Sequence, residues 1–111
     1  MSGNKISPDE WRAEKIREFE VGELSAAADA MLSLTYHDPD RLWVEAFLVA
    51  AVDSEMDVQI RRLAVTCLGH VARIHGAIGP DSVAALRRAL QDPELSGVAE
   101  DAIGDVESFA S

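Results

Sequence analysis

The sequence contains an internal repeat. Residues 57–69 read Asp-Val-Gln-Ile-Arg-Arg-Leu-Ala-Val-Thr-Cys-Leu-Gly, and a weaker copy begins 35 residues later, at position 92. The corresponding positions are Asp57 and Asp92, Ile60 and Leu95, Ala64 and Ala99, Leu68 and Ile103, Gly69 and Gly104, and Val71 and Val106. A period of this size is typical of stacked pairs of helices, in which each pair buries its apolar face against the next. Such stacks present extended surfaces and rarely enclose a catalytic pocket, so the repeat predicts a binding protein.

Length and composition agree with a single domain over residues 1–111, large enough to bury a core without disulfides or metals. Apolar residues make up 48% of the chain, with only 4 prolines and 7 glycines, and the abundance of Ala and Leu favours helices. The single cysteine cannot form an internal disulfide, and neither a membrane-spanning segment nor a signal peptide is recognisable. We therefore expect an all-α, cytoplasmic protein that does not enter a membrane.

Caps and breakers divide the chain into six expected helices. Residues 7–10, Ser-Pro-Asp-Glu, form a capping box with proline at the first helical position, and Gly76 occupies the place of a left-handed C-cap. Asp38, before Pro39, is the expected cap of the third helix. The expected helices cover about residues 8–19, 23–36, 39–52, 58–75 and 80–90, and the last one follows a turn at Asp92 and Pro93 and runs to about residue 109. Paired in order, they predict a short α-solenoid of about three helical hairpins, with the strongly apolar helix 39–52 in its middle.

The charge of the chain narrows the choice of partner. Twenty acidic residues against 10 basic ones give a net charge of −10, which would repel a nucleic acid. Acidity can serve solubility alone, which is the simpler explanation. However, no Lys or Arg follows Arg88, whereas several acidic residues do: Asp92, Glu94, Glu100, Asp101, Asp105 and Glu107. This uneven distribution favours a basic protein as the partner, with the charge accelerating the encounter.

Two of the expected helices carry a polar stripe opposite their apolar stripe. The stripe of helix 58–75 is Gln59, Arg62, Thr66, His70 and Arg73, and that of the last helix is Gly97, Glu100, Asp101, Gly104, Asp105 and Ser108. Second helices of successive hairpins lie side by side in a solenoid, so the two stripes should be neighbours. The basic side chains of one can then pair with the carboxylates of the other, each exposed pair contributing about 0–1 kcal/mol. Alternatively, the carboxylates meet a basic partner whose backbone approaches closely at Gly97 and Gly104. The sequence leaves both possibilities open.

A second candidate surface lies at the junction before the third helix, where residues 36–40 read Tyr-His-Asp-Pro-Asp. A turn with a cap explains Asp38 and Pro39, but it does not explain the neighbouring Tyr36 and His37. Exposed tyrosines and tryptophans are frequent anchors of protein interfaces. Trp43 also follows this junction, although a tryptophan on an apolar helix more often belongs to the core.

Neither a metal site nor a catalytic constellation can be recognised. Cys67 and His70 have a usable spacing for a metal, but they fall on different stripes and lack a third and fourth ligand. A buried Cys67 should have a raised pKa and be unreactive. Phosphate-binding loops, nucleophile elbows and paired catalytic carboxylates are also missing from the sequence. We therefore expect neither an enzyme nor a bound metal or cofactor.

Residues 57–69 resemble the second helix of a HEAT-type repeat. Three longer segments resemble a family of small bacterial HEAT-repeat proteins, the immunity proteins of contact-dependent inhibition and related polymorphic toxin systems. These segments are residues 36–44, residues 63–75 with Thr-Cys-Leu-Gly-His and Ala-Arg-Ile-His, and residues 97–109. The resemblance implies a non-catalytic inhibitor that binds one cognate toxin domain, often a nuclease, and blocks its active site or its target.

The acidic surface and the resemblance together lead to one hypothesis: an immunity protein of three HEAT-like hairpins that forms a one-to-one complex with a basic toxin domain. The expected contact residues are Tyr36, His37, Asp38, Asp40, Arg62, His70, Glu100, Asp101 and Asp105. The alternative is a HEAT-like scaffold or adaptor in an endogenous complex. An enzyme, such as a HEAT-like lyase or DNA glycosylase, ranks third because it would need a basic or ligand-lined groove.

Overall fold

The computed structural model of the protein describes residues 6–110, and all regular secondary structure in this range is helical. Its helices are α1 (Pro8–Val21), α2 (Leu24–His37), α3 (Arg41–Val52), α4 (Val58–His75), α5 (Pro80–Leu90) and α6 (Ser96–Phe109). The predicted all-α fold of six helices is thus confirmed for this part of the chain. None of these helices is long and apolar enough to cross a membrane.

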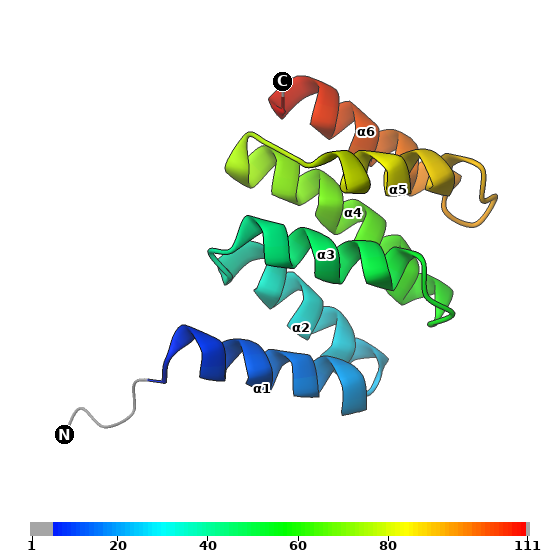
Figure 1. Ribbon diagram of the computed structural model, residues 1–111. Helices are drawn as coiled ribbons and strands as arrows, with labels where there is room; N and C mark the ends of the chain where they lie inside the picture. The colour runs from blue at the N-terminus through cyan, green and yellow to red at the C-terminus, as the bar shows by residue number, and fades with distance from the viewer. Residues whose placement is uncertain (1–5, 111) are drawn as a thin grey trace.

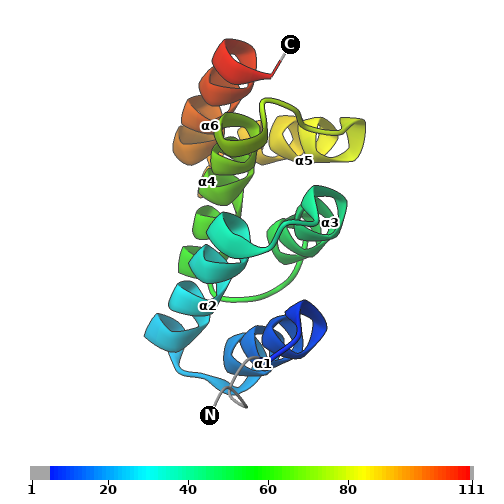
Figure 2. The same cartoon turned by 90° about the vertical axis from the view of Figure 1, so that its left-hand side faces the viewer.

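The helices form two layers (Figure 1). One layer contains α1, α3 and α5, and the other contains α2, α4 and α6, as Figure 2 shows edge-on. Each hairpin contributes one helix to each layer, with α1 packed on α2, α3 on α4, and α5 on α6. Helix α4 contacts α2 on one side and α6 on the other, and it also packs on α3, so it is the central helix of the stack.

Several helix ends lie where their capping residues predict. The hydroxyl of Ser7 accepts a hydrogen bond from the amide of Glu10, and the Glu10 carboxylate accepts one from the amide of Ser7, which confirms the capping box of α1. Asp57 caps α4 by accepting from the Gln59 amide at 2.8 Å. Helix α4 ends at Gly76, whose φ of 65° lies in the left-handed region that favours glycine.

The start of α3 differs from the prediction. Its N-cap is Asp40, whose carboxylate accepts a hydrogen bond from the Trp43 amide at 3.1 Å. Asp38 is not the cap, because its Oδ1 accepts from the Asp40 amide at 3.0 Å and holds the turn that precedes the helix. The aspartate before Pro39 therefore stabilises a turn, and the helix begins two residues later than expected.

The start of α6 agrees with the expected turn at Asp92 and Pro93. Residues 92–95 form a turn in which the Asp92 carboxylate accepts from the Glu94 amide at 2.9 Å, and α6 begins only at Ser96. Here too an aspartate before a proline holds a turn.

A buried glutamate joins the second hairpin to the third. Glu45 of α3 is only 6% exposed, and its Oε1 accepts hydrogen bonds from the Gly79 amide at 2.8 Å and the Ser82 hydroxyl at 2.5 Å. Its other carboxylate oxygen pairs with Arg41. Gly79 is the N-cap of α5 and has no side chain to act as one. Glu45 therefore supplies the missing cap and places a negative charge at the N-terminus of α5, where the helix dipole favours it.

The core follows α4 along most of its length. This helix buries the apolar side chains of Ile60, Ala64, Val65, Cys67, Leu68, Val71 and Ala72. Near the end of the helix, Ile74 lies on the same apolar side but is 44% exposed. Helix α1 joins through aromatic contacts, because the Phe19 ring lies 5.0 Å from Phe47, which in turn stacks on Trp43 at 5.5 Å. Trp43 is therefore part of the packing between hairpins.

Helices α4 and α6 approach each other closely at Gly69. A methyl group on Gly69 would lie 3.1 Å from the Cα of Ala102 and 2.9 Å from a carboxylate oxygen of Asp105. A side chain at this position would push the two backbones apart, so the contact requires glycine. Gly104, the corresponding residue of the second repeat copy, has open space around it, since no helix of the described chain covers that side of α6.

Substitution of these two glycines by alanine should have opposite effects. Gly104→Ala should raise the free energy of unfolding by up to about 1 kcal/mol, because alanine favours a helix more than glycine does. Gly69→Ala should lower it by about 1–2 kcal/mol despite the same gain, since α4 and α6 must separate. Urea unfolding followed by circular dichroism measures both values. A stabilising effect of Gly69→Ala would contradict the close contact between the helices.

Candidate protein-binding surface

A chain of contacts crosses the exposed face of the layer formed by α2, α4 and α6. The ring of Tyr36 in α2 lies 5.4 Å from the imidazole of His70 in α4, tilted by 34°. The guanidinium of Arg73 contacts Nδ1 of His70, and its Nε lies 3.9 Å from Oδ2 of Asp105 in α6. We call these four residues the ladder. It brings together Tyr36, His70 and Asp105, three residues that the sequence analysis assigned to the partner surface from three different helices.

The surroundings of His70 favour its uncharged form. Partial burial lowers the pKa of this imidazole, and the neighbouring positive charge of Arg73 lowers it further, while Asp105 acts in the opposite direction. A neutral imidazole with its proton on Nε2 can accept a hydrogen bond at Nδ1. This is the atom that faces the Arg73 guanidinium. The ladder is therefore arranged for a neutral His70, and protonation would place two positive charges side by side.

The carboxylates of α6 do not all behave alike. Asp105 is half-buried and engaged with Arg73. Glu100 and Asp101 are exposed, and neither forms an ion pair within residues 6–110. The first of the two possibilities left open by the sequence, an internal ladder, therefore applies to Asp105, whereas the contact of Glu100 and Asp101 with a basic partner stays a prediction.

Asp38 has to be removed from the candidate surface. It is only 4% exposed, and its two carboxylate oxygens accept hydrogen bonds from Nε and Nη2 of Arg12 at 2.7 and 2.8 Å. These bonds lower the pKa of Asp38 and raise that of Arg12. Arg12 also lies 4.3 Å above the ring of Trp43. Asp38 thus links α1 to the start of α3 and is closed to a partner.

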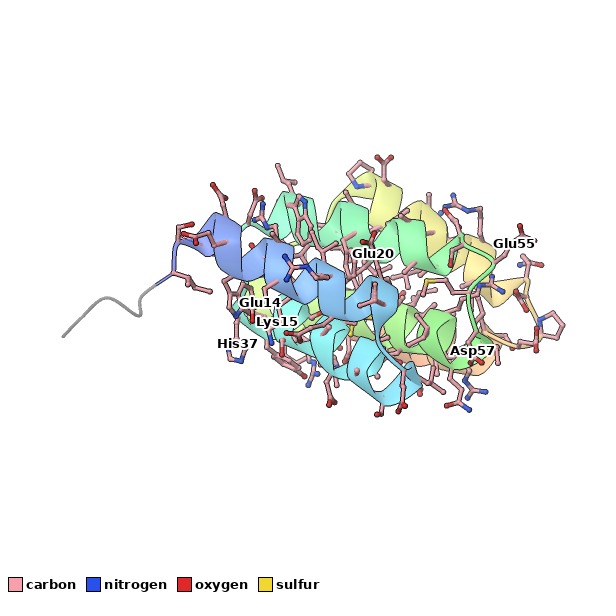
Figure 3. The ribbon with its side chains drawn as sticks, turned by 90° about the horizontal axis from the view of Figure 1, so that it is seen from below. Glu14, Lys15, Glu20, His37, Glu55 and Asp57 are labelled. Atoms are coloured by element: carbon pink, nitrogen blue, oxygen red, sulfur yellow. The ribbon has the colours of Figure 1, made fainter. Side chains whose placement is uncertain are left out.

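The remaining predicted contact residues are accessible. Asp40 is exposed even though it caps α3, and Arg62 is exposed on α4 without an ion pair in the described chain. His37, the last residue of α2, lies at the periphery of the protein when it is seen from below (Figure 3). His37 and Asp40 flank the end of the ladder at Tyr36, which is 47% exposed. The junction therefore offers an aromatic ring and two polar side chains to solvent.

Cys67 lies in a different environment from these residues. Burial in the core raises the pKa of its thiol to about 11, and a hydrogen bond with Thr35 opposes this only in part. The thiol therefore stays protonated at neutral pH and cannot act as a nucleophile or metal ligand. No group of three or more His, Cys, Asp or Glu side chains that could hold a metal ion is found within residues 6–110.

An apolar groove that the sequence patterns did not reveal lies between α3 and α5. It has a volume of about 380 Å³, and its walls include Leu42, Ala46, Val49, Ala50 and Pro80. Leu42 is 67% exposed. The strongly apolar composition of α3 predicts a helix in the middle of the stack, and part of its apolar surface lines this groove. Glu45 in the groove is already bonded to Arg41, Gly79 and Ser82, and the lining also includes the exposed Asp81.

Comparisons with known proteins found nothing similar: no protein family matches the chain, and neither a curated protein nor a solved structure resembles it significantly.

Because of the Arg12–Asp38 pair, the free energy of unfolding should depend on pH in the acidic range. Because its pKa is lowered in the folded state, Asp38 stabilises the protein above its ordinary pKa of 3.8, and this contribution is lost as the pH falls through the lower, folded value. Asp38→Asn should cost about 1.5–3 kcal/mol at neutral pH, and the difference from the parent protein should shrink as the pH falls below 3.8. Urea unfolding of both proteins at several pH values measures this difference. Asp29→Asn, at an exposed position, is the control and should change little at any pH.

Cys67 should resist thiol reagents in the folded protein. With its pKa near 11, the thiolate fraction at neutral pH is small, and burial blocks access as well. We expect Ellman's reagent to modify Cys67 only after unfolding in guanidinium chloride. Rapid, complete modification of the native protein would show that the packing between α2 and α4 is looser than described.

Proposed function

We propose that the protein is a non-catalytic inhibitor that binds a basic toxin domain through the exposed face of its second layer and the acidic side chains of α6. The resemblance to immunity proteins supplies the class of partner. The buried thiol of Cys67, whose pKa is raised to about 11, offers no reactive nucleophile, which is compatible with a protein that binds and does not catalyse. Its single cysteine agrees with action in the cytoplasm.

The observation that carries this proposal is the exposed charge of α6. Glu100 and Asp101 find no basic side chain in the described chain, and the sequence after Arg88 contains none. Uncompensated like charges destabilise a folded protein through repulsion, and a basic partner removes that repulsion on binding. An acidic inhibitor can also occupy the basic cleft that a nuclease uses for the phosphate backbone.

The ladder gives the acidic side chains a neighbouring contact area of a different kind. Tyrosine and arginine are enriched among the residues that dominate binding energy, and Tyr36 offers 47% of its surface to a partner. Arg73 contacts both His70 and Asp105, so the ring of Tyr36 packs against an imidazole that is itself held by a neighbouring side chain. We expect charge to set the rate of encounter and this aromatic contact to lengthen the life of the complex.

A growth-rescue assay tests the proposal. The protein is co-expressed with the toxin domain encoded immediately upstream of its gene, and rescue is followed by calorimetry of the purified pair. Rescue with a one-to-one complex supports the proposal. Loss of growth with a toxin of demonstrated activity contradicts it and favours a scaffold for an endogenous complex.

Charge reversal on α6 should weaken that complex. Glu100→Lys combined with Asp101→Lys should raise the Kd for the toxin domain by about tenfold or more, because two attractive charges become repulsive. Asp105 is left unchanged, since it pairs with Arg73 and its substitution would disturb the contact with α4. The matched control, Glu14→Lys with Asp29→Lys, changes the charge equally on exposed positions of α1 and α2. Equal affinities of the two double variants, both with native circular dichroism, would refute a specific role of α6.

A further inference from the structure

One side of α6 has no neighbour in the described chain. Ala102 faces α4 at Gly69, so residues about half a helical turn away from Ala102 point outward from the end of the stack. These residues are Gly97, Glu100, Gly104 and Glu107, which follow one another at the spacing of a single helix face. All four are exposed, and a methyl group on either glycine would meet nothing within 4 Å. We call this set the end stripe.

The corresponding face of α4, in the preceding hairpin, is covered by another helix. In the repeat, Gly104 of α6 corresponds to Gly69 of α4, and Gly69 is the point where another helix packs backbone to backbone. The residues that flank Gly69 on the same face of α4 are Val65 and Ala72, both fully buried. Their counterparts on α6 are Glu100 and Glu107. The end stripe therefore has the glycine that admits a helix, but with carboxylates where α4 has apolar side chains.

The charge of the end stripe selects among possible occupants. A second copy of the protein would bring the same carboxylates to the contact, and a nucleic acid or an anionic membrane would bring phosphates, so each would be repelled. A helix with Lys or Arg on one face suits both the carboxylates and the uncovered glycines of the end stripe. Its basic side chains can reach Glu100 and Glu107, while its backbone approaches over Gly97 and Gly104.

We propose that the end stripe of α6 is the docking site for a basic helix of the partner, which packs across Gly104 as α6 packs across Gly69. This inference rests on the proposed function, because the basic partner is the toxin domain proposed above. It is narrower than that proposal, since it distinguishes Glu100 and Glu107 on the end stripe from Asp101 and from Asp105, which contacts Arg73 of α4. The docked helix continues the layer of α2, α4 and α6 by one further member.

A peptide probe tests the docking site without the toxin. The probe is an alanine-rich peptide of about 20 residues, long enough to be helical alone, with arginines on one face. A second peptide of the same composition has its arginines distributed around the helix. Both are titrated into the isotope-labelled full-length protein at about 0.15 M salt, where charges beyond roughly 8 Å are screened. We expect the first peptide to bind more tightly and to shift the amide signals of Gly97, Glu100, Gly104 and Glu107 most.

Two kinds of variant test separately the charge of the end stripe and the close approach of the docked helix at Gly104. Glu100→Lys with Glu107→Lys should raise the Kd for the first peptide by about tenfold or more, and the Glu14→Lys, Asp29→Lys control by less than about threefold. Gly104→Leu leaves the charge intact but fills the glycine position, so it should also weaken binding by about tenfold while the thermal midpoint is unchanged or higher. Should Gly104→Leu fail to fold, Gly104→Ala replaces it, with a smaller expected loss of binding.

The outcomes distinguish this inference from the proposed function. Equal binding of the two peptides, signal shifts spread over the whole acidic surface, or full affinity of the folded Gly104 variant would overturn the docking site. Rescue from the toxin that persists in the Glu100→Lys, Glu107→Lys variant would overturn it too, while leaving the inhibitor function in place. Localised peptide binding by a protein that rescues from no active toxin would refute the inhibitor function and support the docking site.

Discussion

The close approach of α4 and α6 at Gly69 determines how the last hairpin sits on the rest of the protein. Because Gly69 has no side chain, the backbone of Ala102 comes within contact distance, and α6 is held at a fixed rotation about its own axis. That rotation turns Asp105 toward Arg73 and turns Glu100, Gly104 and Glu107 away from the stack. A single glycine in the central helix thus decides which carboxylates are used internally and which remain exposed.

Polar contacts between successive hairpins act together with this packing. Arg12 reaches from the first hairpin to Asp38 at the start of the second, and Glu45 reaches from the second to Gly79 and Ser82 at the start of the third. In both cases a helix of one layer holds the turn that precedes the next helix of the same layer. Breaking either contact would leave a buried carboxylate without its partner, which costs more than an exposed ion pair contributes. The exposed pair of Arg88 and Asp53, at 2.9 Å, adds little by comparison.

The parts of this architecture that could be predicted from the sequence are those encoded within one helical turn. The cap at Asp57, the left-handed end at Gly76 and the apolar stripe of α4 depend on residues at most a few positions apart, so local patterns reveal them. Asp38 was misjudged because the group that binds it, Arg12, is 26 residues distant, and a lone aspartate before proline is indistinguishable from a cap. The partner of Glu45 is similarly remote, at Ser82, 37 residues further on.

The candidate surface was predictable to the extent that helix periodicity and the repeat define it. The repeat places the stripes of α4 and α6 beside each other, and the ladder from His70 through Arg73 to Asp105 follows. Which side of α6 stays uncovered could not be predicted, because that depends on the rotation of the helix against Gly69. Glu107 was therefore counted among the acidic residues but not assigned to the partner surface.

The two glycines of the end stripe argue against the view that α6 merely closes the stack. A terminal repeat needs a polar outer face for solubility, and Glu100 and Glu107 alone would meet that need. Gly97 and Gly104 contribute nothing to it. Each destabilises the helix by about 1 kcal/mol relative to alanine, and neither is required by any neighbour, by a turn or by a positive φ. At Gly69 the same cost is offset by a packed helix. The basic helix proposed to dock at the end stripe would provide a comparable offset at Gly104, with the flanking glutamates attracting its positive charges.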